Sequence, residues 1–179
     1  MAKKKKAAKK KTAAKRERKK VIIPDAEEAR REYNAIEKLL TRDTERMWKA
    51  MGAVVRLAGR TEVGRSLLRE AGRAAGAVIA ETGMFGVGRG GDAVEVTSEW
   101  LKVLAAVGCE YEIGKAGRDE VEVFVLECPA GLSAEDGREV CDAGMSADCE
   151  LVRRLGGELI IGDTIATGAD CCHLVVRTA

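Results

Sequence analysis

The stretch GELIIGDTIATGADCCHLVVR (157–177) decides the fold, because it reads as two strands joined by a turn. Residues 157–166 and 171–177 are rich in β-branched and apolar side chains, and TGAD (167–170) between them consists of turn-forming residues. Two such runs separated by a short turn are typical of a β-hairpin. We therefore expect an antiparallel hairpin over residues 157–177.

A second hairpin is expected upstream of the first. The runs CEYEI (109–113) and EVEVFVLEC (120–128) alternate polar and apolar residues, and GKAGRD (114–119) separates them. The remaining patterned segments of the chain are helical, and most of them precede the strands. With helices first and hairpins late, the sequence predicts an α+β fold: N-terminal helices packed on an antiparallel sheet made of two β-hairpins.

Four helices are expected from apolar residues that recur at helical spacing. They span residues 25–58, 62–82, 98–107 and 133–155. Asp25 is a capping residue for the first helix, which is expected to break near Gly52 or Gly59. Gly83 ends the second helix, because glycine adopts the left-handed cap conformation most easily, and Thr97 is expected to cap the third.

Two glycines in the helix predicted at 62–82 lie on one face. Gly72 and Gly76 are one turn apart, and neither carries a side chain. This face of the helix is therefore expected to let another backbone approach closely.

The first 20 residues differ in composition from the rest of the chain. They hold twelve of the 31 Lys and Arg residues and one acid, Glu17, so this segment carries a charge of +11 and the remaining body −9. With almost no apolar side chain larger than alanine, residues 1–20 are predicted to be disordered. Dense lysine attracts phosphates, so RNA, DNA or another polyanion such as an anionic membrane is the expected partner. A solubilising extension without a partner is the alternative.

The domain organisation follows from this change in composition. We expect a basic tail (1–20), an N-terminal helical segment (21–60) and one α+β domain (61–179), since 179 residues are few for two cores. No run of about 18 apolar residues is present, and the lysine-rich start lacks the apolar stretch of a secretory signal. A cytoplasmic protein without a transmembrane segment is expected, with its six cysteines as reduced thiols.

Four blocks of the body resemble the 4-vinyl-reductase domain family. They are LLREAGRAAGAVIAETG (67–83), ECP (127–129), VC (140–141) and TGADCCHLVV (167–176), and their order and spacing match over roughly residues 62–177. The resemblance implies a small α+β fold related in shape to trafficking-complex subunits. It also implies a domain that is often dimeric and that binds small hydrophobic molecules in regulatory proteins.

Cysteines of that family have been proposed to bind metal or to sense redox state. Matched residue by residue, the corresponding thiols are Cys128, Cys141 and Cys172, so the resemblance implies these three as ligands of a metal, with zinc as the candidate. The family commonly has a further cysteine about four residues before the turn glycine. This chain has Thr164 at that place.

The C-terminal pattern is also similar to that of L-2-amino-thiazoline-4-carboxylate hydrolases. The shared features are the ending and the Cys and Asp residues of the intervening helix, here CDAGMSADCEL (141–151). This second resemblance implies ring-opening hydrolysis of a cyclic thioimidate-like substrate. The catalytic candidates are Cys141, Asp148 and Cys172, without assigned roles.

The residues themselves leave three roles open for the thiols. Cys141 lies near the start of a predicted helix, where the helix dipole favours a thiolate, and Cys149 follows about two turns later on the same face. Alternation over 171–177 places Cys172 with the apolar side chains and His173 on the opposite face, which excludes a simple Cys–His dyad. Buried structural thiols, metal or redox sensing, and catalysis all remain open.

The leading hypothesis for function is a small-molecule-binding domain of a regulator or sensor. The helices and the sheet are expected to enclose an apolar pocket for a hydrophobic ligand, lined or braced by Cys128, Cys141, Cys149 and Cys172. Metal or redox sensing by these thiols belongs to the same hypothesis, and a homodimer is the expected assembly. The hydrolase is the alternative.

Overall fold

The computed structural model describes residues 47–178 with the exception of residue 49. In this part of the chain, an antiparallel four-stranded sheet has the order β1-β2-β4-β3. Its strands are β1 (Tyr111–Ala116), β2 (Glu120–Val125), β3 (Glu158–Ile161) and β4 (Cys172–Arg177). Both predicted hairpins are confirmed, and the pairing of β2 with β4 joins them into one sheet.

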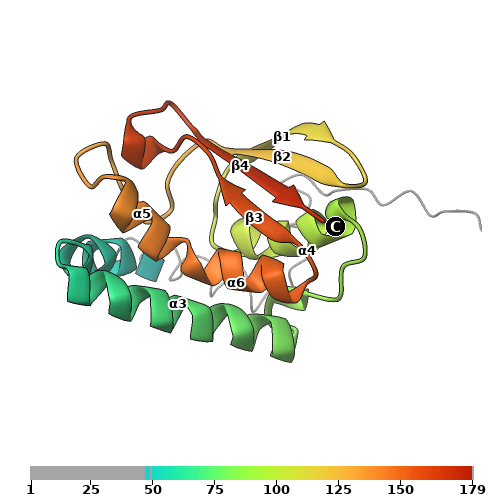
Figure 1. The fold of residues 1–179 in the computed structure, drawn as a ribbon, viewed down its shortest axis with the longest axis horizontal. Coiled ribbons are helices and arrows are strands. Elements are labelled where there is room, and N and C mark those ends of the chain that lie inside the picture. The colour runs from blue at the N-terminus through green and yellow to red at the C-terminus, as the bar shows by residue number, and fades with distance from the viewer. Residues whose placement is uncertain (1–46, 49, 179) are drawn as a thin grey trace, which may run out of the picture.

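Helices cover the sheet in two layers (Figure 1). α4 (Ala93–Ala106) and α6 (Ser146–Arg154) contact the strands, and α3 (Glu62–Thr82) lies outside them against α6 and α5 (Arg138–Gly144). Helices and antiparallel strands are thus segregated, which confirms the α+β class.

The main core lies between the sheet and the inner helices. Every second residue of β2 and β4 is buried: Val121, Val123, Val125, Leu174 and Val176. Trp100 and Leu101 of α4 are fully buried in the same cluster. Arg177 lies on the opposite face of β4 from Leu174 and Val176 and is exposed, so the alternation predicted for the last strand is confirmed.

α3 packs closely on α6 because two glycines remove side chains from the contact. A Cβ atom on Gly72 would lie 2.2 Å from Ser146 Oγ, and one on Gly76 would lie 2.3 Å from Ala147 O. Both distances are far below van der Waals contact, so neither position accepts a side chain without displacing α6. The close backbone approach predicted from the glycine spacing is therefore present.

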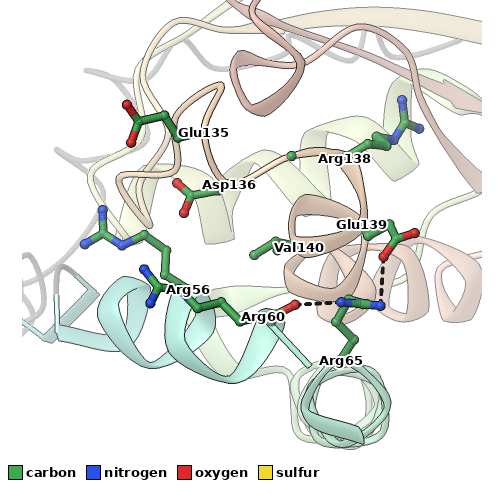
Figure 2. A pocket seen from close by; sticks show the side chains of 10 residues that line it. Arg56, Arg60, Arg65, Glu135, Asp136, Arg138, Glu139 and Val140 are labelled. Atoms are coloured by element: carbon green, nitrogen blue, oxygen red, sulfur yellow. Dashed lines mark hydrogen bonds and ion pairs between the residues drawn. The ribbon is translucent and has the colours of Figure 1, made fainter. Parts of the chain in front are cut away.

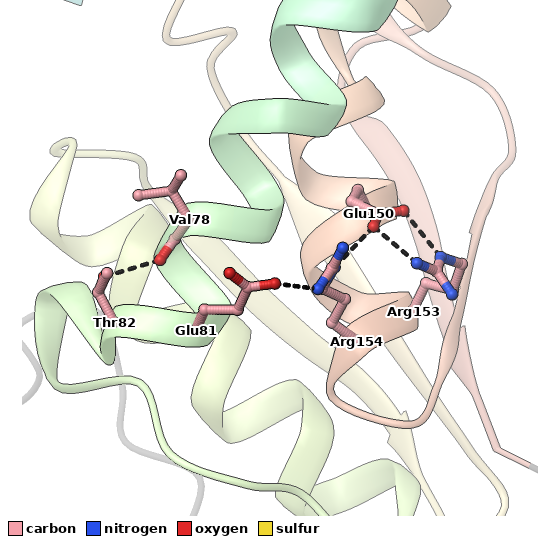
Figure 3. A network of polar contacts seen from close by, with 6 residues as sticks. All are labelled: Val78, Glu81, Thr82, Glu150, Arg153 and Arg154. Carbon is pink, nitrogen blue, oxygen red and sulfur yellow. Dashed lines mark hydrogen bonds and ion pairs between the residues drawn. The ribbon is translucent and has the colours of Figure 1, made fainter.

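Ion pairs join the two helices at the end of this contact (Figure 3). Arg154 bridges Glu81 of α3 and Glu150 of α6, with its Nε 2.8 Å from Glu150 Oε1. Arg153 also binds Glu150, through Nη2 at 2.6 Å. Hydrogen bonds from Arg153 and then Arg154 lower the pKa of Glu150 to about 2. The Glu150 carboxylate therefore stays ionised well into the acid range.

The start of α4 differs from its prediction. The Asp92 carboxylate accepts hydrogen bonds from Val94 N and Glu95 N, both at 3.1 Å, so the helix begins at Ala93. Thr97 lies inside the helix, where its hydroxyl donates a 2.6 Å hydrogen bond to Ala93 O. The cap assigned to Thr97 from the sequence is therefore wrong.

The single helix predicted at 133–155 is divided into α5 and α6. Ser133 N donates a 2.9 Å hydrogen bond to Asp136 Oδ2, which closes a loop before the helix. Gly137 then has a φ of 80°, a left-handed value that no helix interior contains, so α5 begins only after it. A one-residue break at Met145 separates α5 from α6.

Both hairpins have different strand limits from those predicted. β2 ends at Val125, so Cys128 lies in the loop that follows it. β3 ends at Ile161, although a strand was predicted to continue to residue 166. Thr167 N bonds to Thr164 O at 2.8 Å and thereby closes a 3₁₀ turn, η2 (Ile165–Thr167), in place of the last part of that strand.

Residues 50–59 are helical and lead into α3. The predicted break near Gly59 is confirmed, and the helix that follows ends at Gly83 with a φ of 66°, as predicted. The tail (1–20) and the start of the helix predicted at 25–58 lie outside the described residues. In the described part of the chain, none of the helices combines the length and the apolar character needed to cross a membrane.

Candidate functional site

Three of the predicted site cysteines come together at one end of the sheet. Cys141 of α5 is 6% exposed and belongs to a small apolar cluster that is separate from the main core. Its other buried members are Leu132, Val140 and Ala166. Cys128 packs against this cluster, and both Cys128 and Cys172 lie near enough to raise the pKa of Cys141 by their charge. We call Cys128, Cys141, Cys172 and their neighbour Thr164 the thiol cluster.

Each thiol is positioned by a different segment. Cys128 lies in the loop after β2, where its carbonyl oxygen accepts a 2.8 Å hydrogen bond from Gly131 N. Cys141 is in the first turn of α5, and Cys172 is the first residue of β4. Ile165 N donates a 3.4 Å hydrogen bond to the Cys172 sulfur, which ties the turn η2 to this strand. The cluster is thus formed only when all these segments fold together.

Thr164 places a buried hydroxyl beside the Cys141 thiol. The residue is 1% exposed, and its Oγ1 atom has no hydrogen bond of regular length with any described group. The hydroxyl is near enough to lower the pKa of Cys141, although burial of the thiol outweighs this effect. A buried polar atom without a full hydrogen bond costs about 1–3 kcal/mol. Thr164 therefore places a buried and only weakly bonded hydroxyl in the cluster.

The thiols of Cys141 and Cys172 are protonated at neutral pH. Burial raises the pKa of Cys141 to about 11, and burial also raises the pKa of Cys172. The pKa of Cys141 is thus raised, whereas its position near the start of a helix predicted a lowered pKa. Loss of hydration outweighs the helix dipole here. A protonated thiol is a weak nucleophile and a poor metal ligand.

Asp148 is separate from the thiol cluster and serves the core. Its Oδ1 atom accepts a 2.8 Å hydrogen bond from the indole Nε1 of Trp100, which is fully buried. Burial raises the pKa of Asp148, and the Trp100 hydrogen bond opposes this in part. The carboxyl group is therefore a structural bridge from α6 to α4 rather than a base beside Cys141.

Cys149 and His173 also lie apart from the three clustered thiols. Cys149 packs against the main core, and burial raises its pKa to about 11. Its predicted convergence with Cys141 is weakened by the break at Met145, and Cys141 is the smallest of the influences on its pKa. The His173 ring stacks on Phe124 with 4.9 Å between ring centroids and 11° between planes.

The described residues do not fit a metal centre. Within the range 47–178, excluding residue 49, no three His, Cys, Asp or Glu side chains are arranged so that they could hold an ion. Thr164 occupies the position at which the 4-vinyl-reductase domain family commonly has a further cysteine. A threonine hydroxyl is a poor replacement for a thiolate at zinc. Zinc binding by Cys128, Cys141 and Cys172 stays a prediction.

A charged pocket is lined in part by Val140, which also belongs to the small apolar cluster (Figure 2). It has a volume of about 420 Å³, within the usual size range of small-molecule sites. Its lining comes from helix 50–59, the start of α3 and the segment that leads into α5: Arg56, Gly59, Arg60, Arg65, Glu135, Asp136, Gly137, Arg138, Glu139 and Val140. The sequence predicted an apolar pocket lined by thiols, whereas this pocket is polar and contains no cysteine.

Comparison with known proteins identifies a similar fold but no family. No family model matches the sequence, and no curated protein matches it. The described part of the chain has an α+β fold. One similar solved structure is that of a trafficking protein particle complex subunit 3 from Naegleria fowleri, covalently bound to palmitic acid. The TM-score is 0.53 at 13% sequence identity, over 75% of this chain and 94% of that chain, so the likeness concerns the fold alone.

Proposed function

We propose that this chain is a small-molecule-binding domain of a regulator or sensor, with a hydrophobic ligand held at the thiol cluster. The observation that carries the proposal is that Cys128 and Cys172 lie close to Cys141, whose thiol adjoins the buried and weakly bonded hydroxyl of Thr164. Apolar walls with one or a few polar atoms that orient the ligand are the usual composition of small-molecule sites.

The walls of the cluster favour an acyl chain or a similar apolar group with one hydrogen-bonding atom. Leu132, Val140 and Ala166 supply hydrocarbon surface, and the cysteine side chains add soft, weakly polar surface. A polar atom of the ligand could satisfy Thr164 Oγ1, a contribution of about 1 kcal/mol. The fold of the trafficking subunit bound to palmitic acid supports a ligand of this class.

Helix 50–59 is the element that would report binding. Val55 packs against the small apolar cluster, so a ligand that enters between the cluster residues has to displace this helix. Val140 connects the same cluster to the charged pocket, which helix 50–59 also lines. A sensor role follows from this geometry, because occupation of the cluster changes the position of a helix that leads to the N-terminal segment.

Native mass spectrometry of the full chain with palmitic acid tests the proposal. One palmitate per chain is expected to bind, and Ala166→Phe, which fills the cluster, should weaken binding about tenfold or more, since 1.4 kcal/mol is a factor of ten. Thr164→Val keeps the side-chain volume and should weaken binding several-fold. Ala53→Phe adds the same ring at an exposed position of helix 50–59 and should bind as the wild type does. Wild-type protein that takes up no palmitate, or equal binding by Ala166→Phe, would refute the site.

The hydrolase alternative has no observation in its favour. Its three candidates do not form a catalytic arrangement: Cys141 is protonated at neutral pH and has a hydroxyl beside it, and Asp148 is bound to Trp100. His173 is on the opposite face of β4 from Cys172. Hydrolysis of an aminothiazoline carboxylate therefore stays a prediction from the sequence.

We further propose that two copies pair through α3. Its outer face carries an exposed apolar stripe at helical spacing: Val63, Leu67, Ala71, Ala74 and Val78. Val63 is 72% and Leu67 66% exposed, which is a large exposure for apolar side chains. The stripe has larger residues at both ends and alanines between them. Two copies can therefore pair antiparallel about a two-fold axis, which brings identical surfaces into contact.

The polyanion partner of the basic tail stays a prediction, because residues 1–20 lie outside the described part of the chain. Deletion of residues 1–20 should abolish salt-dependent binding to RNA or to anionic vesicles. Salt-dependent binding that persists in the remaining body, which carries a charge of −9, would contradict it.

A further inference from the structure

Two arginines in the charged pocket form no ion pair with a described residue. Arg56 lies in helix 50–59, Arg60 follows directly after the last residue of that helix, and both line the pocket. Arg56 donates one hydrogen bond, from Nη1 to Gly131 O at 2.9 Å, and Arg60 makes no hydrogen bond or ion pair with a described group. Figure 2 shows both side chains extending from this part of the chain with no ion pair drawn to either. Like charges at this spacing repel each other, so the pair is at a higher energy than either arginine alone.

The other two arginines of the pocket are already neutralised. Arg65 binds Glu139 at 2.8 Å and also donates to Gly59 O at 2.9 Å. Arg138 binds Asp142 at 2.6 Å and donates to the backbone oxygens of residues 161 and 162. In Figure 2 the Arg138 guanidinium points away from Arg56 and Arg60.

One acid of the pocket is paired with an arginine, and a second is held by hydrogen bonds from Ser133. Glu139 forms an ion pair with Arg65. Asp136 accepts hydrogen bonds from Ser133 N at 2.9 Å and Ser133 Oγ at 3.4 Å. Glu135 is exposed and has no partner among the described residues. Asp136 keeps its charge when it accepts from the neutral Ser133, so two guanidinium groups and two carboxylates remain without an ion pair among the described residues.

We propose that this pocket binds a small molecule through a phosphate or carboxylate group held by Arg56 and Arg60. Planar guanidinium groups bind such oxygens with two parallel hydrogen bonds each, and the anion also removes the repulsion between the arginines. Glu135 opposes any further negative charge on the ligand and therefore limits the site to small anions. The site is distinct from the thiol cluster and does not depend on the function proposed for it.

Residue-resolved NMR of the full chain, titrated with inorganic phosphate and separately with acetate, tests this site. Saturable shifts are expected at the amides of residues 56–60 and 135–140. Arg60→Gln should weaken phosphate binding roughly tenfold or more, as the loss of a charge-assisted hydrogen bond predicts. Because Arg60 makes no described contact, this variant should fold normally. Glu135→Gln removes the opposing charge and should tighten binding a few-fold.

The control is Arg73→Gln. Arg73 lies on α3, outside the pocket, and pairs with Glu70 at 2.8 Å, so its loss should leave phosphate affinity unchanged. Binding of acetate but not phosphate would assign the site to carboxylates, and tighter binding of phosphate would assign it to phosphorylated ligands. Shifts confined to the lysine-rich residues 1–20, or equal affinity in Arg60→Gln, would overturn the proposal.

Discussion

The indole Nε1 of Trp100 donates a 2.8 Å hydrogen bond to Oδ1 of Asp148, and this bond joins α4 to α6 inside the core. Trp100 is fully buried, and burial raises the pKa of the Asp148 carboxyl group above its ordinary value of 3.8. The folded protein therefore holds a proton at Asp148 more tightly than the unfolded chain does. A residue that resembled a catalytic acid in the sequence is in this way a determinant of stability.

Stability should depend on pH through this group. Because the folded pKa is raised, its contribution is present below the unfolded pKa and is lost as the pH rises through the folded pKa. Asp148→Asn keeps an oxygen acceptor for Trp100 without the charge. We expect the variant to show a smaller loss of unfolding free energy than the wild type between about pH 4 and pH 7, measured by urea denaturation. If Asp148→Asn and the wild type showed the same pH dependence, ionisation of Asp148 in the folded protein would cost little free energy.

Thr164→Val should stabilise the protein. The substitution removes a buried hydroxyl that lacks a full hydrogen bond and keeps the shape of the side chain, so the free energy of unfolding should rise by about 1 kcal/mol. Thr167→Val is the matched control. The Thr167 hydroxyl accepts from Thr164 N at 3.0 Å and donates to Thr164 O at 2.8 Å, so its loss should cost about 1 kcal/mol.

The same Thr164→Val variant should change the reactivity of Cys141. The hydroxyl of Thr164 lowers the pKa of this thiol, so its removal should raise the pKa further above about 11. Alkylation of Cys141 as a function of pH, read by peptide mass spectrometry, measures the change. Cys149 is the internal reference, because Thr164 is not among the causes of its raised pKa. Faster alkylation of Cys141 at neutral pH would contradict the proposed contact.

Gly76→Ala should destabilise the contact between α3 and α6. Its new Cβ would lie 2.3 Å from Ala147 O, which is backbone and cannot rotate away. We expect a loss of about 1–3 kcal/mol, the usual cost of overpacking, although alanine is the better helix former. Ala75→Gly, on an exposed position of the same helix, should lose only about 0.5–1 kcal/mol. A stabilised Gly76→Ala variant would mean that the two helices separate easily.

Leu67→Glu should dissociate the proposed dimer. Leu67 is 66% exposed in the apolar stripe, and a carboxylate there would be buried opposite apolar side chains of the second copy. Sedimentation analysis should find a dimer for the wild type and a monomer for the variant. Lys115→Glu makes a larger change of charge on β1, away from α3, and should remain dimeric. A wild-type protein that stays monomeric at all concentrations would refute the proposed dimer.

Several features of the fold could be predicted because they depend on neighbouring residues. The helix Glu62–Thr82 has the predicted limits, since Thr61 caps its start and Gly83 adopts the left-handed conformation at its end. The opposite faces of Leu174 and Arg177 follow from alternation within one strand. In contrast, the start of α4 depends on a choice between Asp92 and Thr97 as cap, and helical spacing alone does not distinguish them.

The candidate site was predictable only in part. The resemblance pointed to Cys128, Cys141 and Cys172, and the structure brings these three together, but it separates Asp148 and His173 from them. The arginine pair of the charged pocket was missed. Its signal in the sequence is the one-turn spacing of Arg56 and Arg60, which is also common on solvated helices.

Local sequence thus determined the helix at 62–82, the two hairpins, and the sides of the last strand on which Cys172 and His173 lie, because propensity, capping and alternation act over a few residues. Tertiary structure alone decided that Thr164 meets Cys141, that Asp148 meets Trp100, and that the acids near residue 135 face helix 50–59. Burial and charge at these places depend on chain segments far apart in sequence, and their free energies exist only once those segments are packed together.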